Sequence, residues 1–111
     1  MAYDEQLADR VRKTLARRKG LTEQKMFGGL CLMLNRNMAC GVLGDALIVR
    51  VPPEETAAVL KRKHTRPFEF TGTPMRGFVV VAPTGLKTDA QLKAWVTPAA
   101  DFAAKLPPKK K

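Results

Sequence analysis

Residues 26–51 read MFGGLCLMLNRNMACGVLGDALIVRV, and this stretch decides the fold. Leucines at every second position from Leu30 to Leu34 alternate with Cys31 and Met33, which is the two-residue period of a β-strand. Leucine therefore forms one apolar face, and cysteine and methionine form the other. We expect helices to pack on one face, while the second face needs cover from the same chain or from a partner subunit.

Two turns divide this stretch into three antiparallel strands. Residues 35–37, Asn-Arg-Asn, are typical turn residues, and a second apolar strand follows over 38–43. Residues 44–45, Gly-Asp, make a tight turn into a third strand over 46–51. The stretch thus predicts a meander of three strands.

The relation between Cys31 and Cys40 depends on how the first two strands pair. If Leu34 pairs with Met38, the two thiols point to opposite sides of the sheet. If Met33 pairs with Met38, the cysteines lie opposite each other, and only this register allows a cross-strand disulfide. We expect reduced, half-buried thiols, because the chain has the features of a cytoplasmic protein.

Helices and further strands surround the meander. The apolar spacing and the turn and capping residues predict a helix over 4–19, a short helix over 52–61, strands over 67–71 and 77–81, and a helix from a capping box at Thr88 onward. We expect the last helix to be kinked or split at Pro98. The order α-β(3)-α-β(2)-α predicts a two-layer α+β sandwich with an antiparallel sheet.

Length and composition predict a single soluble domain. A chain of 111 residues with 45% hydrophobic and 27% charged residues has an ordinary globular composition. We expect one domain over 1–106 and a disordered basic tail over 107–111. The N-terminus does not read as a secretory signal, and no apolar run is long enough to span a membrane, so a membrane partner is not expected.

The chain is strongly basic, with 20 Lys and Arg against 10 Asp and Glu and a net charge of +10. The excess sits near the N-terminus, after the short middle helix and in the tail, and such an excess favours polyanion partners. The alternative is a solvated surface with no dedicated ligand. The candidate polyanion-binding residues are Arg10, Lys13, Arg17, Arg18, Lys61, Arg62, Lys63 and Arg66. They form one patch if the first helix and the end of the second lie on one side.

The parts of an enzyme or a metal centre are missing from the sequence. His64 is the only histidine, and among basic neighbours it reads as an exposed surface residue. Residues 26–29, Met-Phe-Gly-Gly, lack the ending of a phosphate-binding loop and lead into a strand, so the double glycine reads as a site of close strand approach. The aromatic residues fall mostly at core positions, which predicts no base-stacking surface. We expect no cofactor, no metal and no catalytic residue.

The order of these motifs resembles the N-terminal domain of the TfoX/Sxy family, regulators linked to bacterial natural competence. The resemblance covers nearly the whole chain and rests on residues 26–29, 47–51, 66–68, 71–77, 92–96 and 106–109. It implies an α-β(3)-α-β(2)-α fold that is similar to secretion chaperones and often dimeric. It implies no catalytic residues. Full-length family regulators carry a second, helical domain, so this chain looks like a stand-alone N-terminal domain.

Two functions follow as hypotheses. The first is a non-enzymatic regulatory or adaptor domain that acts in transcriptional regulation by contacting nucleic acid or a transcription-complex protein through its basic surface. The alternative is a chaperone-like homodimer that binds proteins through the cysteine- and methionine-bearing sheet face and has no nucleic-acid role. Basic clusters lying far apart, together with an exposed apolar face, would favour the alternative.

Overall fold

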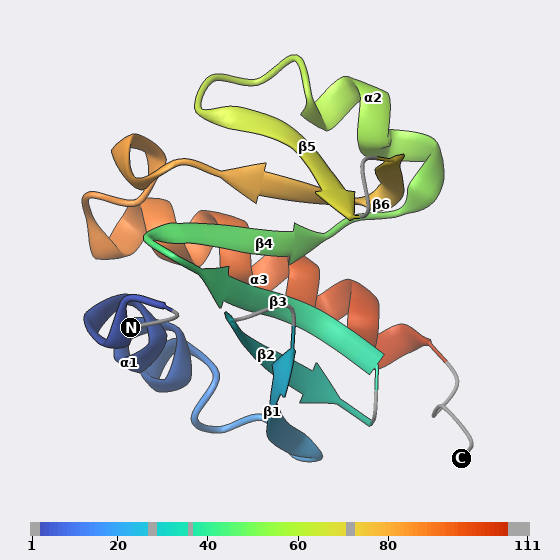
Figure 1. The fold of residues 1–111 in the computed structure, drawn as a ribbon. Helices are drawn as coiled ribbons and strands as arrows, with labels where there is room; N and C mark the ends of the chain where they lie inside the picture. The colour runs from blue at the N-terminus through green and yellow to red at the C-terminus, as the bar shows by residue number, and fades with distance from the viewer. Residues whose placement is uncertain (1–2, 27–28, 36, 71–72, 107–111) are drawn as a thin grey trace.

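A single antiparallel sheet organises the molecule (Figure 1). The computed structural model describes residues 3–26, 29–35, 37–70 and 73–106, so the predicted basic tail lies outside the described residues. The strand order is β1-β2-β3-β4-β6-β5. The strands are β1 (Leu21–Met26), β2 (Gly29–Leu34), β3 (Asn37–Leu43), β4 (Ala46–Arg50), β5 (Thr65–Phe70) and β6 (Thr73–Val81).

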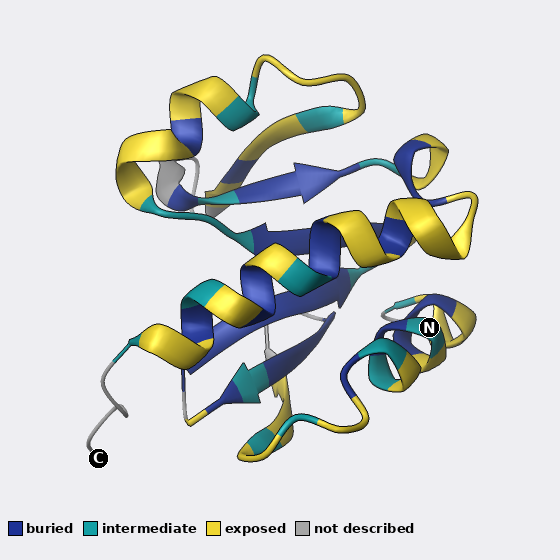
Figure 2. Cartoon of the chain, turned by 180° about the vertical axis from the view of Figure 1, so that it is seen from behind, coloured by how far each residue is buried: buried dark blue, intermediate teal, exposed yellow. Residues whose placement is uncertain are grey.

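Helices form the second layer. They are α1 (Glu5–Thr14), α2 (Thr56–Val59), which directly follows the 3-10 turn η1 (Pro53–Glu55), and α3 (Asp89–Lys105), which follows the 3-10 turn η2 (Pro83–Gly85). Helix α3 lies across β2, β3 and β4, and α1 packs beside it against β3 (Figure 2). The predicted two-layer α+β architecture is confirmed.

The sheet has one strand more than the sequence predicts. Strand β1 pairs with β2 from Leu21, opposite Leu34, to Met26, opposite Gly29. Its sequence, LTEQKM, offers little apolar surface, and Thr22 to Lys25 are exposed. The backbone ladder with β2 therefore holds this edge strand, and hydrophobic periodicity carries no signal for it.

The first and last helices differ from their expected bounds. Helix α1 ends at Thr14, well before Lys19, because Leu15 leaves the helical conformation with φ −102° and ψ 8°, and Gly20 adopts a φ of +77° before β1. Helix α3 is one 17-residue helix that continues through Pro98, so it is not split there. The capping box at Thr88 forms as predicted, with the hydroxyl accepting from Gln91 N at 3.1 Å.

A β-bulge decides which way the cysteines face. Near the turn Met33 pairs with Met38, but the register then shifts, so that Leu32 pairs with Cys40 and Cys31 with Gly41. Both registers considered from the sequence thus occur in one hairpin. The two free thiols point to opposite sheet faces, which excludes a disulfide between them in this fold.

The two sheet faces carry separate cores. The helix-side core joins leucines and valines of the strands to α1 and α3, and Leu32, Leu47 and Val79 in it are fully buried. The second face carries a smaller cluster, consisting of Cys31, Met38, Ala46, Ile48, Phe68 and Val80, all in strands. Each of these six is at most 8% exposed, so this face is largely covered within the single chain.

Gly29 confirms part of the expected role of the double glycine. A Cβ at this position would collide with the backbone carbonyl of Val42 in β3, so only glycine allows the close approach of the two strands. Gly28, the other half of the pair, lies outside the described residues.

Candidate functional site

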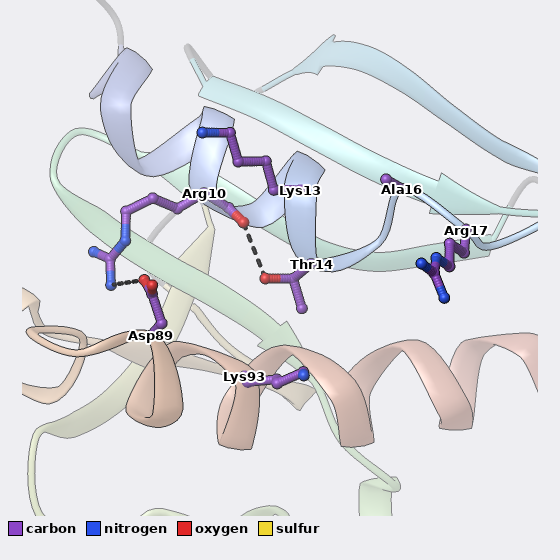
Figure 3. A pocket seen from close by; sticks show the side chains of 7 residues that line it. All are labelled: Arg10, Lys13, Thr14, Ala16, Arg17, Asp89 and Lys93. Carbon is purple, nitrogen blue, oxygen red and sulfur yellow. Dashed lines mark hydrogen bonds and ion pairs between the residues drawn. The ribbon is translucent and has the colours of Figure 1, made fainter.

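A basic groove runs between α1 and α3 (Figure 3). Its volume is about 520 Å³, and its cationic side chains are Arg10 and Lys13 from α1, Arg17 from the turn after α1, and Lys93 from α3. Asp89 is the only carboxylate that lines it. We refer to the site formed by these four cations as the basic groove.

The amphipathic pattern of α1 places these side chains. Leu7, Ala8 and Val11 are buried in the core, so the positively charged side chains lie on the opposite stripe of the helix. Asp4 fixes where the helix begins, because its Oδ1 accepts from the backbone of Gln6 at 2.9 Å. The groove therefore follows from the packing of α1 beside α3.

The groove carries an excess of positive charge. Arg10 Nη2 lies 3.4 Å from Asp89 Oδ1, but the Asp89 side chain is 95% exposed, so water screens this contact. Among the residues that the structure describes, Lys13, Arg17 and Lys93 form no ion pair. Four cations therefore line a groove that contains one weakly engaged carboxylate, which is an arrangement suited to an anion.

Other arginines near the groove have structural partners. Arg12 forms a two-pronged ion pair with Glu23 of β1, at 2.7 and 3.0 Å, and a further bond to Asp9 at 2.7 Å. The hydrogen bonds to these carboxylates raise the pKa of Arg12, which stays charged. Arg18 Nη2 lies 2.6 Å from Asp101 Oδ1 of α3. The candidate Arg18 is thus neutralised beside the groove and does not line it.

The second basic cluster lies on the opposite flank of α3. Lys61, Arg62 and Lys63 follow α2 and are all exposed. The Arg62 guanidinium carbon lies 4.1 Å from the ring centroid of Trp95 in α3, so this cluster borders the same helix as the groove. In Figure 2, α1 and α2 lie on either side of α3. The two clusters therefore share the helical side of the molecule.

Arg66 is the candidate that the fold separates from the others. It pairs with Val80 in the sheet and lines a shallow hollow with Leu43 and Phe68, both of the second sheet face. Its expected place in the patch fails because strand alternation turns it away from the helices.

Lys93 is the groove residue that sequence reasoning missed. It lies between Leu92 and Ala94, with no basic residue next to it in the chain. Only the packing of α3 beside α1 brings it to the groove, and an exposed lysine on a helix gives no sequence signal of that packing.

His64 is exposed, as predicted, and serves the turn before β5. It has a φ of +70°, its carbonyl accepts from Ala82 N at 2.8 Å, and its Nδ1 lies 2.8 Å from Thr84 Oγ1.

Within the described ranges no group of His, Cys, Asp and Glu side chains is arranged to hold a metal. None of the described helices is both long and apolar enough to cross a bilayer.

The buried cysteines should be unreactive in the folded protein. Burial raises the pKa of the Cys40 thiol to about 12, with a smaller contribution from Cys31, and burial also raises the pKa of Cys31. Little thiolate therefore exists at pH 8 in the native state. We expect slow labelling by iodoacetamide at pH 8 and rapid labelling of both cysteines in denaturant, measured by peptide mass spectrometry. Rapid native labelling of Cys40 would contradict the burial described here.

Fold and site together define a small α+β domain with a basic groove between its first and last helices. A sequence model of the TfoX N-terminal domain matches residues 13–103, so the chain belongs to the TfoX N-terminal domain family. This confirms the resemblance seen in the sequence. The match extends from Lys13 in α1 to Ala103 in α3 and includes every strand of the sheet. Searches of curated proteins and of solved structures gave no match.

Proposed function

We propose that this protein is a non-enzymatic regulatory or adaptor domain that binds the phosphate backbone of a nucleic acid in the basic groove. The observation that carries the proposal is the meeting of Arg10, Lys13, Arg17 and Lys93 in one groove with a single exposed carboxylate. Lysine and arginine side chains supply most contacts to nucleic-acid phosphates.

The regulatory part of the proposal draws on membership of the TfoX N-terminal domain family. A domain that contacts backbone phosphates reads no base sequence by those contacts, so it would position or stabilise a transcription complex and leave operator choice to a partner. The free, buried thiols support a cytoplasmic location.

The alternative, a chaperone-like protein-binding dimer, has less support. A protein-binding dimer of this kind requires an exposed apolar sheet face, and basic clusters that lie far apart would favour it. The second-face cluster is at most 8% exposed, and Arg10 and Arg62 both contact α3. We therefore place a homodimer or a transcription-complex protein second as partner, behind nucleic acid.

A salt titration tests the nucleic-acid proposal. Four phosphate contacts give a log–log slope of affinity against salt of about −3.6 on duplex DNA and about −2.8 on a single strand. Raising salt from about 50 to about 200 mM should therefore weaken duplex binding about 150-fold. Fluorescence anisotropy with a labelled duplex and a labelled single-stranded RNA measures both slopes. No binding at the lower salt would overturn the proposal and direct the search to a protein partner.

A further inference from the structure

A second cavity lies on the other flank of α3, away from the basic groove. Its volume is about 140 Å³, and most of its lining is apolar, including Val49, Val59, Pro52 and Pro98. Helix α3, the end of the 3-10 turn η1 and the last residue of α2 enclose it over the end of β4. We refer to this site as the α3 pocket.

Two charged side chains provide the α3 pocket with a hydrogen-bond donor and an acceptor. Arg62 and Glu55 line it together with the Trp95 ring. Arg50 also lines it, but its Nη1 donates to the Met38 carbonyl at 3.3 Å on the second sheet face. A cation, a carboxylate acceptor and an aromatic ring therefore surround a small apolar space.

Arg62 and Trp95 present a stacked pair at the rim. The guanidinium carbon stands 4.1 Å from the ring centroid, Trp95 is 9% exposed and Arg62 is exposed. Arginine planes, like aromatic rings, stack on nucleobases in complexes with single strands. The buried Trp95 ring offers no stacking surface by itself, and its core position in the sequence accordingly predicts no stacking surface. The exposed Arg62 guanidinium, which stacks on this ring, adds an exposed planar group.

The size of the α3 pocket limits what enters it. An engineered cavity of about 150 Å³ holds one benzene ring, whereas pockets for drug-sized ligands start near 300 Å³. One six-membered ring fits, and a purine does not. Glu55 offers an acceptor for the ring N–H or the amino group that pyrimidine bases carry.

The α3 pocket and the basic groove lie on opposite flanks of one helix. A helix with its side chains is about 10–12 Å across, so a short oligonucleotide can reach both. Ala90 and Ala94 are exposed on α3, and their small side chains let a strand pass close to the helix. Lys93 lies on the same helix and lines the groove.

We propose that the α3 pocket takes one pyrimidine base of a single-stranded nucleic acid whose phosphates lie in the basic groove. The inference rests on the proposed function for the phosphate contacts and adds a preference for unpaired strands. In a duplex the base is stacked and paired, so it cannot enter the pocket without being extruded.

The test compares a labelled thymidine decamer with an abasic decamer of the same length and charge. Stacking of one base contributes about a 5- to 150-fold gain in affinity, so the thymidine decamer should bind more tightly by a factor in that range. The only tryptophan of the chain is Trp95, so its fluorescence should change with the thymidine decamer and not with the abasic one.

Two charge-conserving variants and one matched control locate the effect. Ala94→Leu fills the mouth of the α3 pocket from an exposed helix position and should bring the affinity ratio of the two decamers close to one. Ala104→Leu makes the same change at an exposed α3 position outside both cavities and should leave the ratio unchanged. Arg62→Lys keeps the charge and removes the plane, so it should lower the ratio and leave binding of the abasic decamer intact.

Three results would overturn the inference. Equal, salt-dependent binding of both decamers by the wild type would retain the basic groove as a phosphate site and remove the α3 pocket. A preference for thymidine that survives in both Ala94→Leu and Arg62→Lys would place the base elsewhere. If neither decamer binds, the proposed function fails together with the inference that depends on it.

Discussion

Replacing Leu32 with alanine should lower the free energy of unfolding by about 2–5 kcal/mol. Leu32 is fully buried in the helix-side core and lies in β2 between its neighbours Glu23 in β1 and Cys40 in β3. Strands on both sides prevent the site from collapsing, so a cavity remains and adds to the lost hydrophobic transfer energy. Urea denaturation followed by circular dichroism measures the change.

Leu43→Ala is the matched control for this variant. Leu43 is half-buried and packs at the margin of the second-face cluster, so the same truncation should cost clearly less there. Equal losses in the two variants would contradict the description of the helix-side core as the main source of stability.

A triple variant should abolish most of the salt dependence of nucleic-acid binding. Arg10→Ala, Lys13→Ala and Arg17→Ala together leave only Lys93 in the groove, so the duplex slope should fall from about −3.6 to about −0.9. A rise from about 50 to about 200 mM salt should then weaken binding only about 3- to 4-fold. Folding should change little, because surface substitutions usually shift stability within about 0.5 kcal/mol.

The control for net charge removes three cations that lie outside the groove. Lys25→Ala, Arg66→Ala and Lys105→Ala change the total charge by the same amount, and all three residues are exposed. We expect the wild-type slope in this variant, measured by the same anisotropy titration. If both triple variants lose the same slope, the whole surface attracts the polyanion and the groove has no special role.

The sequence predicted the elements whose signals are local. The leucine alternation in β2 and the capping box at Thr88 each depend on neighbours in the chain, and both occur as expected. Strand β1 has no such signal, since its backbone pairing with β2 and the ion pair between Glu23 and Arg12 leave no apolar alternation in the sequence. Pro98 was expected to disrupt α3, but Trp95 and Ala99 on either side of it are buried against the sheet, and this packing keeps the helix in one piece.

Helix periodicity in the sequence predicted some residues of the candidate site but not the others. Arg10 and Lys13 lie where a helical stripe places them, and Arg17 lines the groove from beyond the helix end. Lys93 depends on the packing of two helices that are far apart in the chain. Arg66 depends on the register between β5 and β6, which the pattern of a single strand does not determine.

The position of α3 at the end of the chain determines when the hydrophobic core can form during synthesis. All six strands precede α3, yet its side chains Leu92, Val96 and Ala100 cover the helix-side core. A nascent chain that has emerged only as far as β6 therefore exposes the leucines and valines of that sheet face, and such surfaces aggregate readily. The helix-side core is complete only once the last helix has emerged, so we expect a chain that ends before residue 89 to aggregate and not to form a smaller domain.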